Sequence, residues 1–153
     1  MLPPGRGPSF RTMDNASSPS SVRVIVVGYD GSATAKMAVD YAARQAGGAG
    51  RVIVVHAYGG AGEREHAGAV IDGLALEDDP LLETEWEAEL VDGSPAEAIL
   101  GVAYDRSADQ IVVGSHGRGR LARAALGSVS QEVLHRSDVP VVVVGPERDP
   151  AIA

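Results

Sequence analysis

The sequence predicts an α/β domain built on a parallel sheet, and three observations support this class. The apolar residues are mostly Val, Ala, Leu and Ile, with a single Phe and a single Trp, a mixture suited to β-branched strands and alanine-rich helices. Near-continuous apolar runs of strand length recur along the chain, which indicates strands buried on both faces. Helical patterns lie between these runs, so the alternation is that of β-α-β units with right-handed crossovers.

The first predicted unit is a strand, a helix and a second strand. The run VRVIVVG over Val22–Gly28 has strong strand propensity. Ser32 follows as a candidate N-cap, and Ala33–Ala46 places small apolar residues at helical spacing before a glycine pair ends the pattern. Arg51–Tyr58 repeats the strand pattern, which completes the unit.

The second half continues the alternation from a less regular start. Residues 59–79 contain several glycines and a weak apolar pattern, so we expect one short helix with frayed ends. Thr84–Val91 alternates polar and apolar residues, which is typical of a strand at the edge of a sheet. Residues 94–105 predict a helix that opens with Ser-Pro-Ala-Glu, which places serine at the N-cap, proline at N1 and glutamate at N3 of a capping box.

The last predicted strands are Gln110–Gly114 and Val139–Val144, with a loop and a helix over Ser128–Arg136 between them. The chain length of 153 residues suits one domain, and we place it at residues 22–147. Residues 1–21 are rich in Pro, Gly and Ser, so we expect a disordered tail or an overlong start of the reading frame. The last few residues, 148–153, are expected to form a short C-terminal tail.

Composition limits the classes of function. The formal net charge of −8 predicts repulsion from nucleic acid and from anionic membrane surfaces, so we expect neither as a partner. The lack of cysteine excludes disulfides, thiolate chemistry and cysteine-ligated metals. The first residues resemble neither a secretory signal nor a membrane anchor, so a cytoplasmic location is expected. Any phosphate ligand must therefore bind at a local site.

Unusual residues follow three of the predicted strands. In open parallel sheets, ligands bind beyond the carboxyl ends of the strands, where the strand order reverses. Residues 28–32 follow the first strand, residues 56–58 end the second, and residues 114–130 follow the fourth with the sequence GSHGRGRLARAALGSVS. We expect these segments to meet at one edge of the sheet.

The glycine-rich segment has two parts that suit a ligand. Gly114 and Gly117 flank a turn directly after a strand, where glycine permits positive φ and a close approach of ligand to backbone. Further on, Gly127 and Ser128 open the last helix, and Ser128 with Gln131 has the pattern of a capping box.

Phosphate is the ligand group that this segment favours. The backbone amides of Ser128, Val129 and Ser130 and the helix dipole form an anion site. Residues 114–136 contain a single acid, Glu132, and four arginines: Arg118, Arg120, Arg123 and Arg136. Glycine and serine can also act as plain caps, and arginines as a solvated face, but their combination at one sheet edge favours phosphate.

Three side chains near the same edge leave alternatives open. Asp30, directly after the first strand, either caps the following helix or has a role in binding, which would be a hydrogen bond to ribose or a share in a Mg²⁺ held by phosphates. His56 and His116 have no carboxylate and second histidine at ligand spacing, which argues against a metal site made by protein alone. His116, inside the loop, could contact either a ligand or the loop backbone, and a plain structural role is favoured for it.

The spacing Gly114-x2-Gly117-x9-Gly127-Ser128 resembles the signature of the ATP-binding branch of the universal stress protein family. The opening VIVVGYDGS, the strand VIVVHAY, the helix start GSPAEAI and the closing SDVPVVVV resemble that family in order and spacing. The resemblance runs from about Val22 to Val144, and the long-spaced glycine motif together with the early Asp-Gly-Ser makes it specific.

The resemblance implies a Rossmann-like open sheet of five parallel strands in the order 3-2-1-4-5, with helices on both faces. It implies a homodimer, formed through the last strand Val139–Val144, and ATP, with Mg²⁺, as ligand. By position, Gly28, Asp30 and Ala57 would contact adenine and ribose. The residues for ribose and phosphates would be Val113, Gly114, Gly117, Gly127, Ser128, Val129 and Ser130, to which we add Arg118 from the arginine cluster. The stretch between the second and third strands is shorter than in the family, which implies a truncated second helix.

Two other nucleotide motifs fit less well. Residues 117–122 match the dinucleotide fingerprint G-x-G-x-x-A, but they lie in the last β-α-β unit and the helix begins later. The P-loop pattern is absent, and the single lysine, Lys36, lies in the first helix. We therefore expect an ATP-binding regulatory or stress-response module with no assigned catalytic residue and at most slow hydrolysis. The alternative is a dimeric protein-interaction module whose glycine loop is vestigial.

Overall fold

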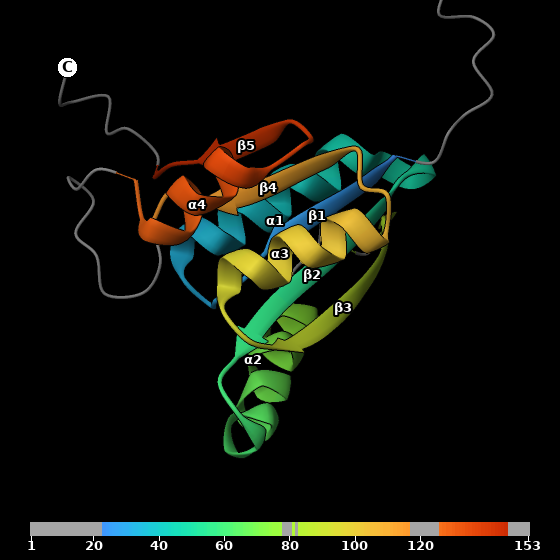
Figure 1. The fold of residues 1–153 in the computed structure, drawn as a ribbon. Helices are drawn as coiled ribbons and strands as arrows, with labels where there is room; N and C mark the ends of the chain where they lie inside the picture. The colour runs from blue at the N-terminus through green and yellow to red at the C-terminus, as the bar shows by residue number, and fades with distance from the viewer. Residues whose placement is uncertain (1–22, 78–80, 82, 117–125, 147–153) are drawn as a thin grey trace, which may run out of the picture.

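The computed structural model describes residues 23–77, 81, 83–116 and 126–146, and its centre is a five-stranded parallel sheet in the order β3-β2-β1-β4-β5 (Figure 1). The elements in chain order are β1 (Val24–Gly28), α1 (Ala33–Ala46), η1 (Gly47–Ala49), β2 (Arg51–Tyr58), η2 (Ala61–Glu63), α2 (Arg64–Glu77), β3 (Glu85–Asp92), α3 (Pro95–Asp105), β4 (Gln110–Gly114), α4 (Ser128–Arg136) and β5 (Val141–Val144). The predicted fold class and strand order are confirmed. The expected terminal tails lie outside the described residues.

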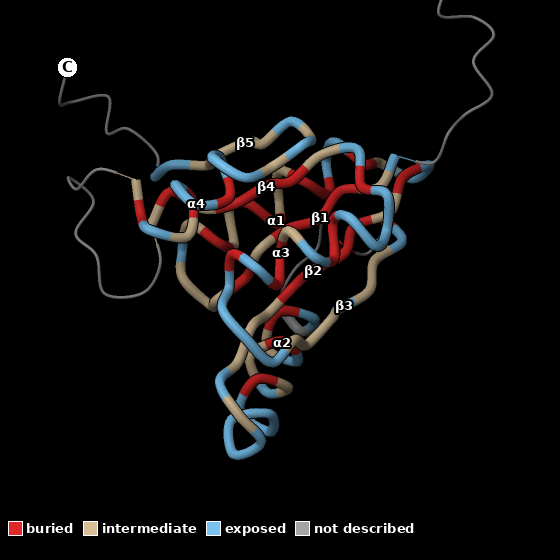
Figure 2. Tube along the Cα trace, viewed as in Figure 1, coloured by how far each residue is buried: buried red, intermediate tan, exposed pale blue. Residues whose placement is uncertain are grey.

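Helices cover both faces of the sheet, and each face has its own core. Alternate side chains of a strand point to opposite faces, so Val27 and Val54 pack with α1 and α2, whereas Val26 and Val55 pack with α3 and α4. Figure 2 shows the buried residues concentrated along the central strands. The apolar runs of β1 and β4 are continuous because both of their faces are covered.

The first helix begins as its sequence predicts. The Ser32 hydroxyl accepts a hydrogen bond from the Ala35 amide at 3.2 Å, and Gly47 at φ 58° ends the helix with a bond from its amide to the Ala43 carbonyl. In α3, Ser94 is the N-cap and Pro95 follows at N1, but the Ser94 hydroxyl makes no capping bond. The predicted capping box there is wrong, and the helix begins instead on the bond from the Ala98 amide to the Ser94 carbonyl at 3.0 Å.

The second helix differs most from the sequence expectation. Predicted as short and truncated, α2 has 14 residues, as many as α1. Its glycines weaken the apolar pattern, but Ala67, Ile71 and Leu74 are buried, the latter two in the core shared with α1. Packing of this face stabilises the helix where propensity alone does not.

The last strand is shorter than predicted at its start. It begins at Val141 rather than Val139, after Pro140, which has no amide proton to add to a sheet. The Pro140 carbonyl still accepts a hydrogen bond from the Ile111 amide at 2.9 Å, and this contact fixes the start of β5 against β4. Within the described residues, no helix is long and apolar enough to cross a bilayer.

Candidate functional site

A cleft of about 220 Å³ opens at the carboxyl edge of β1, β2 and β4. This is the point where the strand order reverses, because β1 is followed by β2 on one side and has β4 on the other. The starts of α1, α3 and α4 border it. The described lining residues are Gly28, Tyr29, Asp30, Ser32, Ala35, Val55, His56, Ala57, Pro95, Ile99, Val113, Gly114, His116, Gly127, Ser128, Val129 and Ser130.

The structure brings the predicted site residues together as far as it describes them. Those at the cleft are Gly28, Asp30, Ala57, Val113, Gly114, Gly127, Ser128, Val129 and Ser130. Gly117 and Arg118 lie outside the described residues, as do Arg120 and Arg123. Arg136 does not belong to the cleft: it lies in the last turn of α4 and pairs with Glu132 at 2.8 Å. The sequence analysis counted Arg136 in the positive charge near residues 127–130, and this was wrong, because Arg136 lies at the opposite end of α4.

Gly114 is required for packing rather than for a turn. Its φ is not among the positive values found for described glycines, so the predicted positive-φ role is wrong for this residue. A Cβ at Gly114 would lie 2.7 Å from Thr34 Oγ1 and 2.9 Å from the Thr34 carbonyl carbon. Glycine therefore lets the first turn of α1 approach the end of β4. This contact sets the distance between two walls of the cleft.

The start of α4 presents backbone amides to the cleft. Gly127 is the N-cap, with φ −60° and ψ 159°, and its carbonyl accepts the bond from the Gln131 amide at 3.0 Å. The three amides between them, those of residues 128–130, precede the first carbonyl-bonded amide of the helix. The predicted capping box of Ser128 and Gln131 is wrong, because Ser128 is already helical and the Gln131 side-chain amide donates to the Leu126 carbonyl at 2.6 Å.

The backbone at the end of β4 accepts hydrogen bonds from two sides. The Ser130 hydroxyl, only 3% exposed as a residue, donates to the carbonyls of Gly114 and Ser115 at 3.0 and 3.3 Å. From the other side, the Thr34 hydroxyl donates to the His116 carbonyl at 2.6 Å. These bonds connect α1, β4 and α4 at the cleft. Ser130 therefore offers a ligand its backbone amide, since its hydroxyl is used within the protein.

Asp30 and the two histidines combine structural bonds with a place at the cleft. Asp30 Oδ1 accepts a hydrogen bond from the Ser32 amide at 2.9 Å, whereas the N-cap of α1 is Ser32 itself. His56 Nδ1 lies 2.7 Å from the Tyr29 carbonyl oxygen, and His116 Nδ1 lies 2.8 Å from Ser115 Oγ. The structural role expected for His116 is present in its bond with Ser115, and both histidines also line the cleft.

Sequence reasoning missed the apolar wall of the cleft. Val55, Ile99 and Val113 are each 3% exposed or less; of these only Val113 was predicted, and Pro95 adds to the same wall from the start of α3. Two signals could have found them. Val55 is two residues before Ala57 on the same face of β2, and Pro95 and Ile99 are four residues apart at a helix start.

Metal ligands are sparse at this site. Across the part of the chain that the structure describes, no group of three or more His, Asp or Glu side chains is placed to hold a metal ion. Asp30 is the single carboxylate among the described lining residues. A Mg²⁺ ion here would take most of its ligands from phosphate oxygens and water, as Mg²⁺ commonly does.

Comparisons with known proteins agree on one family. A model of the universal stress protein family matches residues 21–145. A universal stress protein of Thermus aquaticus, from the QAH/OAS sulfhydrylase 3′ region, is 39% identical over 139 residues, which cover 80% of this chain and 98% of that protein. Universal stress protein Rv1636 of Mycobacterium tuberculosis is 30% identical over 142 residues, 82% of this chain and 97% of that one.

Solved structures have the same fold. The crystal structure of a universal stress protein in complex with cAMP superposes with a TM-score of 0.67 at 31% identity, covering 81% of this chain and 97% of that chain. The crystal structure of Rv1636 gives a TM-score of 0.57 at 30% identity, with 85% and 100% covered. The superpositions cover nearly the whole of both neighbouring chains, so these neighbours share the fold of the present domain.

Proposed function

We propose that this chain, which belongs to the universal stress protein family, binds an adenine nucleotide in the cleft, with ATP as the ligand. The observation that carries the proposal is the meeting of an apolar wall and a helix start at one sheet edge. The first suits a base and the second suits phosphates. A relative of the same fold crystallised with cAMP, which is also an adenine nucleotide, supports this ligand class.

The phosphates are assigned to the start of α4. The amides of Ser128, Val129 and Ser130 would donate to phosphate oxygens, and the helix dipole adds about 0.3–1 kcal/mol for a nearby negative charge. The described lining residues include no lysine or arginine, so backbone amides carry the binding there. Gly117 and Arg118 are proposed to complete this end of the site.

The base and ribose are assigned to the other end of the cleft. Val55, Ile99 and Val113 present apolar surface to a base, beside Gly28 and Ala57. Asp30 lies at the end of β1, where its carboxylate can accept hydrogen bonds from ribose hydroxyls. When bound, Mg²⁺ would neutralise phosphate charge, with Asp30 as its candidate protein ligand.

We assign the protein a regulatory role in stress response, with at most slow hydrolysis. Fast phosphoryl transfer needs a cation placed on the transferring group and a group that orients the nucleophile. Lys36, the single lysine of the chain, lies in α1 rather than in a P-loop, and Asp30, the single carboxylate among the described lining residues, lies at the β1 end rather than at the start of α4. A cytoplasmic location is part of the proposal, and cell fractionation with immunodetection tests it.

We further propose a homodimer through β5, because the two edges of the sheet differ. At one edge, β3 carries Glu85, Glu87 and Glu89, with Arg51 paired to Glu85 at 2.6 Å. Charges of this kind block pairing with another chain. At the other edge, β5 is four valines without a charge, all half-buried. A second copy pairing along β5 would cover this edge.

Mass spectrometry of small molecules released by denaturing the purified protein tests the ligand assignment. ATP or another adenine nucleotide in stoichiometric amount is the expected result. If the protein releases none, and the folded protein does not take up ATP with Mg²⁺ in dialysis at millimolar concentration, the assignment is wrong. The dimeric interaction module with a vestigial glycine loop would then be the better account.

A further inference from the structure

Strand β3 ends the described sheet, because it pairs with β2 on one side and is the last strand in the order. An edge strand presents backbone amides and carbonyls to which another extended segment can bond. Its side chains alternate between two faces. The face toward α3 is acidic and the face toward α2 is apolar, with Glu85, Glu87 and Glu89 on the first and Trp86, Ala88 and Leu90 on the second.

The acidic face of β3 carries more negative charge than its basic partners neutralise. Arg51 pairs with Glu85 at 2.6 Å, and Arg106 pairs with both Glu87 and Glu89. Two arginines thus serve three glutamates, whose side chains are 65%, 40% and 29% exposed along the strand. This charge keeps the β3 strand of a second copy away, whereas it attracts a segment with basic side chains.

The apolar face of β3 has a small residue at its centre. Trp86 and Leu90 are half-buried and pack on the core shared by α1 and α2. Ala88 lies between them and is exposed. Residues directly opposite on neighbouring strands have Cβ atoms about 4.5–5.5 Å apart. A large apolar side chain opposite Ala88 would therefore cover the exposed parts of this face.

The chain itself contains a segment with the complementary pattern before β1. Residues 9–13 have the sequence SFRTM, in which Phe10 and Thr12 share one side of an extended strand and Arg11 lies on the other. Phe10 is the single phenylalanine of the chain. Residues 1–13 contain two arginines and no acid, although the net charge of the chain is −8. The segment thus combines an apolar side with a basic side.

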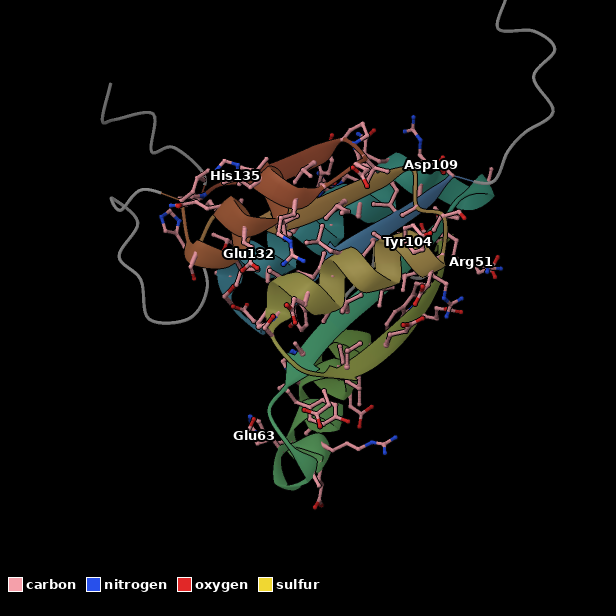
Figure 3. All side chains as sticks on the ribbon, viewed as in Figure 1. Arg51, Glu63, Tyr104, Asp109, Glu132 and His135 are labelled. Atoms are coloured by element: carbon pink, nitrogen blue, oxygen red, sulfur yellow. The ribbon has the colours of Figure 1, made fainter. Side chains whose placement is uncertain are left out.

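The start of β1 is close enough for this segment to reach the edge of the sheet. The Arg23 carbonyl accepts a hydrogen bond from the Arg51 amide at 2.8 Å, and Arg51 is in register with Glu85 at the start of β3. Figure 3 shows Arg51 at the end of the sheet where the strands begin. A strand beyond β3 lies three strand spacings from β1, about 14 Å, and residues 14–22 span up to about 30 Å when extended.

We propose that residues 9–13 add to β3 as an additional, antiparallel strand. The direction follows from the connection, since a strand that leads into β1 must end where β3 begins. Antiparallel edge strands on otherwise parallel sheets are common. Phe10 lies opposite Ala88, where it covers the apolar face. Arg11 then lies opposite Glu87, where it adds a cation to the acidic face. The docked segment closes this edge of the sheet to other extended chains and leaves β5 for a second copy.

Paramagnetic NMR of the full chain tests this docking. The chain has no cysteine, so a nitroxide attached to Ser9→Cys labels one position, which lies opposite Glu89 in the proposed register. We expect broadened amide signals for the neighbouring part of β3 and unchanged signals for β5 at the other edge. A mixture of spin-labelled chains with isotope-labelled chains that lack the nitroxide separates docking within one chain from docking on a neighbour.

Arg11→Glu in the spin-labelled chain tests the register, and Arg11→Lys is the matched control because it keeps the positive charge. In Arg11→Glu, a cross-strand pair of opposite charge becomes a pair of like charge, so the ratio of docked to free segment should fall about fivefold. In Arg11→Lys, the ratio should stay close to that of the parent. The inference is overturned by unbroadened β3 signals in the parent, by equal broadening in Arg11→Glu, or by broadening found only between chains. Nucleotide binding is untouched by any of these results.

Discussion

Gly114→Ala would place a methyl group where the first turn of α1 meets the end of β4. The new Cβ would lie 2.7 Å from Thr34 Oγ1, 2.9 Å from the Thr34 carbonyl carbon and 3.0 Å from the Ala35 amide nitrogen. Two of these are backbone atoms, so no side-chain rotation relieves the contact. The helix start or the strand end must move.

The size of the effect follows from these contacts. Overpacking of this kind costs about 1–3 kcal/mol. Displacement of the helix start also weakens the bond from the Thr34 hydroxyl to the His116 carbonyl, now 2.6 Å, at about 1 kcal/mol. We expect a loss of about 2–3 kcal/mol in the free energy of unfolding. Because both displaced segments line the cleft, ATP affinity should fall at least tenfold, which is about 1.4 kcal/mol.

Urea denaturation measures the stability, and calorimetry of the folded variant measures the affinity. Gly101→Ala is the control, since it lies in the exposed middle of α3 and a Cβ there meets nothing within 4 Å. That substitution should stabilise the protein by about 0.5–1 kcal/mol, because alanine favours a helix over glycine. If Gly114→Ala matches the unmodified protein in both stability and affinity, the packing argument is refuted.

Two other predictions concern helix starts and assembly. Ser32→Ala should lower the free energy of unfolding by about 1 kcal/mol, because it removes the hydrogen bond from the Ala35 amide to the serine hydroxyl. Ser94→Ala, at an N-cap without such a bond, should lower it clearly less. Equal losses of the two variants in urea denaturation would contradict this. Val143→Pro should convert the dimer to a monomer in sedimentation velocity. The carbonyls of Pro140 and Val144 point toward β4, because they accept hydrogen bonds from the amides of Ile111 and Ser115. Backbone groups alternate in direction along a strand, so the Val143 amide points away from β4, toward a second copy, and proline removes this donor. A Val143→Pro variant that remains fully dimeric would show that the interface lies elsewhere.

The central strands and the location of the site could be predicted from the sequence for physical reasons. Strands β1 and β4 are buried on both faces, so their apolar runs have few other interpretations. The rule that parallel sheets bind ligands at their carboxyl edge then placed Asp30, Gly114 and Gly127 near one another. Local pattern and topology were sufficient for these features.

Features that depend on distant contacts could not be predicted. The length of α2 depends on burial of Leu74 in the core shared with α1. The need for glycine at 114 comes from Thr34, which is far away in the chain. None of these contacts leaves a periodic signal in the sequence.

Calorimetric titration of the folded, nucleotide-free protein with ATP and Mg²⁺ tests the central claim most directly. The account predicts saturable binding with a dissociation constant below about 1 mM, which corresponds to more than about 4 kcal/mol of binding free energy. Absence of binding at that concentration, by protein shown to be folded, would contradict it.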